Sequence, residues 1–337
     1  MRQYSPLTLS SYILGPIFII ASHLGSGLVV WTGLSWGAVL WVVSLYLIRM
    51  LAITSVYHRL LTHRSYQAPS WVLWVGSIIA SGAGQMGPSW WKAHHIHHHQ
   101  YTDLKPDTHS PYRFLPNLSH DKGNHESSPV ISEGAQQKSH AIPSLKNWFQ
   151  VLRGFCWSHY GWLLSSRFFP VKLPNDVERD WVLKSIDRLH FLPLLALGAV
   201  SYGIGGIEYL GAFFLSTTLL FHGVQTVNSL SHMFGAQPFL TDDHSRNNGF
   251  VALLTLGEGW HNLHHAFQSS CRQGITVRAG QVSYLLDPTF SFIKLLASLK
   301  LASKLRVPTE GELLARANQP SIQHQEYSAI LQPLVDS

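Results

Sequence analysis

The residues in this chain best suited to chemistry are its histidines, which gather in three clusters. Of the 21 histidines, these clusters hold ten: His58 and His63; then His94, His95, His97, His98 and His99; then His261, His264 and His265. Each cluster lies just outside a long apolar run. Neutral imidazole is the commonest protein ligand for transition metals. The sequence therefore predicts a metal site at the surface of a membrane.

The spacing within the clusters predicts how many metals they hold. Residues at i, i+3 and i+4 share one face of an α-helix, a spacing that His261, His264 and His265 meet. In the middle cluster the triplets starting at His94 and at His95 both fit, and spacing alone does not choose between them. His58 and His63 are five apart, so they reach one metal only if the helix end unwinds; otherwise they bind different metals. These eight positions exceed the roughly four to six donors of one centre, which predicts two metals close together.

The type of ligand indicates the type of reaction. The clusters contain almost no Asp or Glu, and an imidazole-rich set suits iron, copper or zinc. The His-Glu-x-x-His pattern of a hydrolytic zinc site does not occur in the sequence. Redox chemistry on a lipid-soluble substrate is the interpretation we favour.

The elements that carry these clusters are predicted to be membrane helices. The chain is 46% hydrophobic and 12% charged, about half the charged fraction of a soluble protein. Runs without charge exceed the roughly 20 residues that cross hydrocarbon. We expect four spans in two tight hairpins: Ser11–Trp31, Leu34–Tyr57, His190–Tyr209 and Gly211–Ser231. The Gly- and Ser-rich run Trp71–Trp91 is predicted to be one further helix, buried against the membrane domain.

Lys and Arg lie outside the predicted hairpin loops, so both termini and every histidine cluster are expected on the cytoplasmic side. Arg49, close to the end of the second span, is expected to extend to the membrane interface. The net charge of +6 fits contact with anionic lipid, and no basic stripe with interleaved aromatics indicates nucleic-acid binding. Two cysteines are too few for an iron–sulfur cluster.

We expect one membrane domain over residues 1–307 with interleaved cytosolic segments, followed by a polar tail over 308–337. Residues 110–147 read as a long polar loop, and His109 at its edge is expected to be solvated. The charged segment 175–187 is predicted to form a helix that leads into the third span. The segment 289–306 is predicted to form a basic helix along the membrane surface.

From about Tyr46 to Arg272 the sequence resembles the membrane fatty acyl desaturases, in particular bacterial-like members of the stearoyl-CoA (Δ9) type. The resemblance rests on three histidine boxes in order and on two linking motifs. The matching segments are HRLLTHRSY at 58–66, GPSWWKAHHIHHHQYTD at 87–103, GFCWSHYGW at 154–162, VNSLSHMFG at 227–235 and GEGWHNLHH at 257–265.

The resemblance implies a set of site residues. Two irons would be held by His58, His63, His95, His98, His99, Asn228, His232, His261, His264 and His265, with Asn228 acting through a water. The triplet starting at His95 is preferred because Asp107 and His109 then follow the box by eight and ten residues, as in the family. Gln85 would lie near the kink of an acyl tunnel, and Tyr46 and Met50 at its far end.

The resemblance also implies a fold and an activity. The fold would be an all-α integral membrane protein, with four transmembrane helices in two hairpins beneath a helical cytosolic cap that holds the di-iron site. The activity would be insertion of a cis double bond, Δ9 by analogy, into a saturated acyl chain with O2 and two electrons. An external ferredoxin or cytochrome b5-like protein would supply the electrons. The acyl carrier (CoA, carrier protein or lipid) is open, and Ile96 stands where many relatives have an arginine.

The membrane would be the bacterial inner membrane, or the endoplasmic reticulum in a eukaryote. Two rival functions are kept. One is a membrane hydroxylase on the same di-iron scaffold, which would give hydroxyl groups in place of double bonds. The other is a metal-transport protein, which would need ligands lining a path through the membrane.

Overall fold

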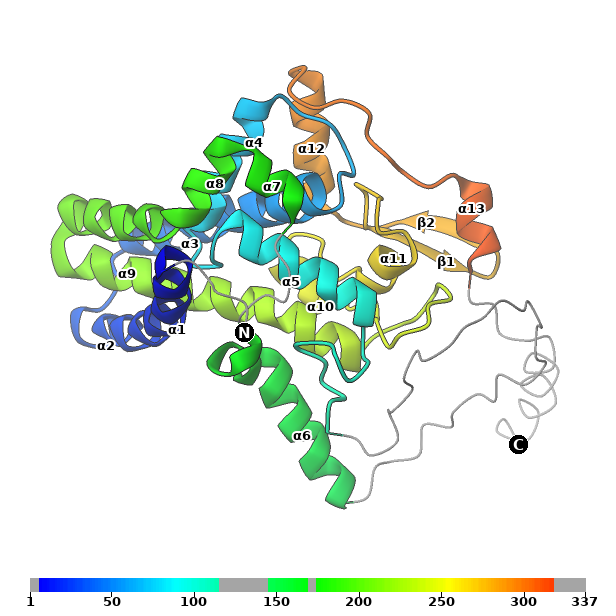
Figure 1. Ribbon diagram of the computed structural model, residues 1–337, viewed down its shortest axis with the longest axis horizontal. Coiled ribbons are helices and arrows are strands. Elements are labelled where there is room, and N and C mark those ends of the chain that lie inside the picture. The colour runs from blue at the N-terminus through cyan, green and yellow to red at the C-terminus, as the bar shows by residue number, and fades with distance from the viewer. Residues whose placement is uncertain (1–5, 115–144, 169–173, 318–337) are drawn as a thin grey trace.

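A computed structural model of the chain describes residues 6–114, 145–168 and 174–317, and these are mostly helical. Within them, three stretches are long and apolar enough to cross a membrane, Gly15–Thr32, Trp36–Thr62 and Phe191–Met233. They are formed by α1 (Pro6–Ser26), α2 (Leu28–Thr32), α3 (Trp36–Leu51), η1 (Ala52–Thr62) and α9 (Phe191–Met233). Figure 1 shows α1, α2, α3 and α9 extending together on the left of the molecule. The prediction of a helical membrane protein is confirmed at this level.

Helix α9 folds back on itself at a pair of glycines. Gly205 and Gly206 have non-helical backbone angles. At Gly206 φ is +63° and ψ is −143°, a conformation that residues other than glycine rarely adopt. A Cβ on Gly198 would lie 3.2 Å from the ring of Phe213. In a straight helix those two residues would be about 22 Å apart. The two halves of α9 therefore run side by side, and the reversal lies a few residues before Tyr209, where the hairpin loop was predicted.

Arg49 does not extend to the membrane interface as predicted. Its side chain is 1% exposed. The guanidinium donates to the carbonyls of Leu45 and Gly82 and to the hydroxyls of Ser216 and Thr217, at 2.8 to 3.1 Å. These acceptors replace water as hydrogen-bond partners, so the side chain joins α3 to α9 and to the turn at residue 82 instead.

In Figure 1 the remaining elements lie above, below and to the right of these helices. The helices are α4 (Ser70–Ser81), α5 (Pro88–Tyr101), α6 (Leu145–His159), η2 (Gly161–Leu164), η3 (Ser166–Phe168), α7 (Asn175–Arg179), α8 (Trp181–Arg188), α10 (Gly249–Leu254), α11 (His261–Ala266), α12 (Pro288–Ser298) and α13 (Glu310–Ala315). Two short strands, β1 (Ile275–Arg278) and β2 (Gln281–Tyr284), pair antiparallel, with Ile275 opposite Tyr284. The turn between them, Ala279 and Gly280, has positive φ at both residues, as a tight hairpin requires. Within the described ranges this hairpin and four isolated β-bridges depart from an all-α fold.

The predicted helix over 71–91 is wrong, because the chain breaks between α4 and α5. The break contains three glycines, and φ is +72° at Gly84 and +62° at Met86. Pro88 then occupies the first turn of α5, where a missing N–H costs nothing. Helix α4 is also only partly buried, since Trp71 and Val75 are each about half exposed.

The charged segment 175–187 forms two helices in place of one. Asp180 separates α7 from α8, and its carboxylate accepts from the backbone N–H groups of Val182 and Leu183 as an N-cap. The basic segment 289–306 is helical only to Ser298. Beyond it Ser303 pairs with Gln67 through two backbone hydrogen bonds of 2.8 Å, which hold the chain extended.

The predicted tail over 308–337 begins with folded residues. A capping box between Thr309 and Glu312 starts α13, and Leu313 is fully buried against Phe239 and Leu263. Residues 318–337 lie outside the described part of the chain. So do residues 115–144, which make up most of the predicted polar loop.

Candidate metal centre

His58 lies in a π-helix, η1, which continues α3, and His63 is the residue that caps the C-terminal end of η1. In a π-helix the N–H of residue i+5 bonds to the carbonyl of residue i, and the N–H of His63 bonds to the carbonyl of His58 at 3.1 Å. Residues five apart therefore align, and the two imidazole rings lie 4.8 Å apart between centroids. For both histidines to reach one metal, the helix end had to depart from α-helical geometry. It does so by widening into a π-helix.

Helix α5 separates the histidines of the middle cluster onto different faces. Nε2 of His94 lies 2.9 Å from the carbonyl of Phe168, and Nε2 of His97 lies 3.0 Å from the carbonyl of Pro106. His95, His98 and His99 face the other clusters instead. The structure therefore brings together the triplet that starts at His95.

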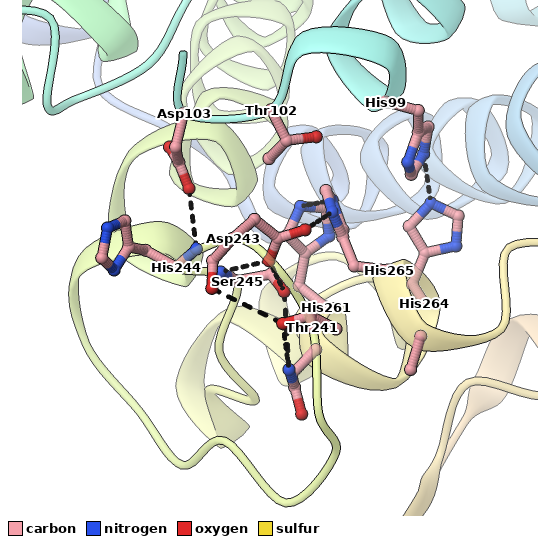
Figure 2. Close-up of polar contacts among 12 residues, drawn as sticks. His99, Thr102, Asp103, Thr241, Asp243, His244, Ser245, His261, His264 and His265 are labelled. Carbon is pink, nitrogen blue, oxygen red and sulfur yellow. Dashed lines mark hydrogen bonds and ion pairs between the residues drawn. The ribbon is translucent and has the colours of Figure 1, made fainter. Parts of the chain in front are cut away.

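Two groups of histidines result, each drawn from distant parts of the chain. Group A contains His58, His63, His95 and His264, and group B contains His98, His232, His261 and His265. Within each group one ring nitrogen of every histidine lies within 4.8 Å of the others. Nε2 of His99 lies 2.9 Å from that of His264 and 3.0 Å from that of His95, beside group A. Figure 2 shows His99 and His264 facing each other, with His261 and His265 nearby on α11.

Three histidines of group B are backed by aspartates. Nδ1 of His98 bonds to Asp107 at 3.0 Å, that of His232 to Asp103 at 3.1 Å, and that of His265 to Asp243 at 2.8 Å. Burial raises the pKa of Asp107, but His98 and His109 outweigh burial and hold the pKa below its usual range. The pKa values of Asp103 and Asp243 are lowered in the same way, against burial, chiefly by His232 and His265. All three carboxylates are ionised at neutral pH and can only accept.

This pairing favours the tautomer of each ring that carries its proton on Nδ1. An ionised carboxylate accepts from Nδ1–H, so Nε2 of the neutral ring carries a lone pair. Nε2 of His261 lies 3.1 Å from that of His232 and 3.0 Å from that of His265, and it offers at most one proton to the two. Lone pairs that converge in a buried space repel one another unless a cation lies among them. The donor set therefore fits a metal ion.

The histidines of group A have different hydrogen-bonding partners from those of group B. Nδ1 of His58 lies 2.5 Å from Glu258, and the same carboxylate accepts two bonds from the buried guanidinium of Arg59. Nδ1 of His264 faces the neutral amide of Gln273 at 3.3 Å. Burial is the largest cause that lowers the pKa of His63, His95 and His264 well below 6.5, so these rings are neutral and available as ligands.

An apolar cavity opens onto both groups. Its lining includes Met50, Ile53, Trp91, Val224 and Val227, and it meets His58 and His95 of group A and His98 and His261 of group B.

Of the other predicted site residues, some line this cavity and some do not. Asn228 lines it beside the histidines, and its amide donates to Gln225 at 3.1 Å. Tyr46 and Gln85 are not among the residues that line the cavity. The Tyr46 hydroxyl donates to the Leu254 carbonyl, and Gln85 is buried. A Cβ on Gly223 would meet both Tyr46 and Met50, so those two side chains lie against the same point of α9.

His109 is not solvated as predicted. It is 5% exposed, with its ring 4.4 Å from that of His98 and 5.1 Å from that of Trp162. It follows Asp107, whose carboxylate accepts from the His109 backbone N–H at 3.2 Å. The turn that presents Asp107 to His98 thereby draws His109 inward.

The carboxylates that meet these histidines were not predicted as their partners, although Asp107 served to choose the register of the middle cluster. The three clusters themselves contain almost no Asp or Glu, but Asp103, Asp107, Asp243 and Glu258 each meet a histidine of group A or group B. A signal existed for three of them: Asp103 and Asp107 follow the middle cluster within eight residues, and Glu258 precedes His261 by three. No such signal existed for Asp243, because it lies in a separate loop and contacts His265 only in the folded chain.

Comparison with known proteins places the chain in a family. Residues 33–272 match the model of the fatty acid desaturase family. The chain belongs to this family. The sn-1 stearoyl-lipid 9-desaturase of Synechocystis is 30% identical over 84% of this chain and 76% of its own length. The Delta-9 desaturase-like 2 protein of Arabidopsis thaliana is 30% identical over 82% of the chain and 79% of its own length. The icosanoyl-CoA 5-desaturase of Limnanthes douglasii is 30% identical over 78% of the chain, which spans 63% of that protein.

As a fatty acid desaturase, the chain is an oxidoreductase with histidine groups able to hold metal ions and with helices long enough to span a membrane. The nine histidines and one asparagine that the resemblance proposed as ligands all fall within residues 33–272.

Proposed function

We propose that this protein inserts a cis double bond, at the Δ9 position, into a saturated acyl chain. The observation that carries the proposal is the pair of histidine groups that open onto one apolar cavity in a chain of the desaturase family. An apolar cavity suits a chain of methylenes, and the histidines at its wall suit two metal ions.

The ligands we propose are His58, His63, His95, His98, His99, His232, His261, His264 and His265, with Asn228 acting through water. Two irons held there would use O2 and two electrons to remove two hydrogens from adjacent carbons. With two protons, the overall reaction yields the alkene and two molecules of water. The protein's own part is to hold the ligand nitrogens in one tautomer through the carboxylates and to hold the acyl chain still in the cavity.

The cavity wall supports a role in substrate selection for Met50 and, through its contact with Met50, for Tyr46. Met50 lines the cavity, and Tyr46 packs beside Met50 against Gly223. We propose that these two side chains close the far end of the acyl tunnel, and that Gln85 lies near its kink. The relatives' names include both CoA-linked and lipid-linked substrates, so an assay must offer both carriers.

The fold supports a topology of four spans in two hairpins. Residues 15–32 and 36–62 would form one hairpin, and the two halves of α9 the other, because α9 reverses at Gly205 and Gly206. The remaining helices, α13 included, would form a cytosolic cap in the same domain, with both termini in the cytoplasm. Electrons would come from a ferredoxin or a cytochrome b5-like protein. The membrane would be a bacterial inner membrane or the endoplasmic reticulum.

The test is expression in a host that lacks Δ9 desaturase, followed by mass spectrometry of double-bond positions. The expected product is a Δ9-unsaturated acyl chain in cells with the wild-type protein. His98→Ala should abolish it, whereas His97→Ala, a control in the same box, should not, because His97 faces the Pro106 carbonyl. Hydroxylated chains without double bonds, or full activity of His98→Ala at equal membrane levels, would contradict the proposal.

A further inference from the structure

The two histidine groups differ in the charge that surrounds them. In group B three of four rings meet an aspartate through Nδ1, and in the described residues none of these three carboxylates forms an ion pair with Lys or Arg. His261 is the exception, because its Nδ1 has no hydrogen-bond partner in the described part of the chain. The carboxylates behind group B therefore sum to three negative charges.

Group A has much less negative charge behind it. Only His58 meets a carboxylate, that of Glu258, and Arg59 pairs with both Glu258 and Asp287. The sum over Arg59, Glu258 and Asp287 is one negative charge. His264 meets a neutral amide, and Nδ1 of His99 has no hydrogen-bond partner within the described ranges.

We propose that the two metal sites have unequal affinities, with group B binding its ion first and retaining it while the ion of group A exchanges. The inference rests on the proposed function, which places one metal in each group. A carboxylate behind a ligand histidine fixes its tautomer and raises its basicity, and removing such a partner costs roughly 10- to 100-fold in metal affinity. Group B has two more of these contacts than group A. The difference in dissociation constants should therefore be at least about 100-fold.

The experiment titrates the full-length, metal-free protein in detergent with Co²⁺ alone. Bound ions are counted by mass spectrometry, and the dissociation constants come from competition with a chelator. Two equivalents are expected, the first bound at least about 100-fold more tightly than the second. His265→Ala should remove the tight equivalent, and His63→Ala should remove the weak one.

Conservative variants keep the test decisive if a histidine variant fails to fold. Asp243→Asn retains an oxygen for Ser245 but loses the charge behind His265. It should weaken the tight equivalent about 10- to 100-fold and leave the weak one unchanged, whereas Glu258→Gln should affect only the weak one. Asp242→Asn is the matched control, because this neighbouring carboxylate is exposed, and it should change neither constant.

Two results would overturn the inference. One is a pair of equivalents with constants within threefold of each other, which would leave the two-metal site itself intact. The other is an effect of Asp243→Asn on the weak equivalent. Fewer than two equivalents on folded wild-type protein would overturn the proposed two-metal function together with this inference.

Discussion

Replacement of Arg59 by methionine should destabilise the protein strongly. Arg59 is fully buried, and its guanidinium donates to Glu258, to Asp287 and to the Cys271 carbonyl at 2.7 to 3.1 Å. Methionine has a similar length but no charge and no donor. The substitution leaves the carboxylate of Glu258 buried, with only His58 beside it.

The magnitude follows from what each acceptor loses. Asp287 still accepts from the backbone N–H groups of Gln273, Gly274 and Phe290, so its loss is small. Breaking a buried ion pair by removing one partner costs about 3–5 kcal/mol, and an unsatisfied buried carbonyl about 1 kcal/mol more. Arg59→Met should therefore lower the free energy of unfolding by about 4–6 kcal/mol.

The assay is unfolding by SDS titration in mixed micelles, followed by tryptophan fluorescence. The double variant Arg59→Met/Glu258→Gln should recover part of the loss, because it removes the stranded charge. The reasoning is refuted if Arg59→Met lies within 1 kcal/mol of wild type, or if the double variant is no more stable than the single one.

Two further predictions concern the α9 reversal and the response to acid. Gly206→Val should destabilise the protein by about 1–3 kcal/mol, because valine is forbidden at that backbone conformation; Gly203→Ala, where a Cβ meets no atom within 4 Å, should be neutral in the same unfolding assay. The metal-free protein should lose stability as pH falls below 6.5, because burial lowers the pKa of His63, His95, His99, His261 and His264 in the folded state only. Unfolded chains then bind protons that folded chains do not, at a cost of about 1.4 kcal/mol per pH unit for each ring that stays neutral. Thermal unfolding between pH 7.5 and 5.5 measures this slope, and a midpoint that does not change with pH would contradict it.

Features that depend on local composition could be predicted from the sequence. The uncharged runs predicted the membrane helices, and the i, i+3, i+4 spacing predicted that His261, His264 and His265 lie on one helical turn. The reversal in α9 was anticipated because two apolar stretches were joined with little room for a loop. In each case the information lies within about 20 neighbouring residues.

Features that depend on distant residues could not be predicted in this way. Spacing allowed either His94 or His95 to begin the ligand triplet, and His94 faces away because the Phe168 carbonyl, 74 residues later, lies beside its Nε2. Arg49 is buried because Ser216 and Thr217 on another helix offer acceptors. The π-helix η1 could not be predicted either, since nothing in the sequence around His58 and His63 distinguishes a π-helix from an α-helix.

Both histidine groups draw on α11. Group A includes His264, and group B includes His261 and His265. During synthesis α11 emerges after all the candidate membrane helices, the last of which ends at Met233. Neither group can therefore be complete until the ribosome has passed His264 or His265. Metal ions bound as proposed would therefore reach both groups only after all the candidate membrane helices have been synthesised.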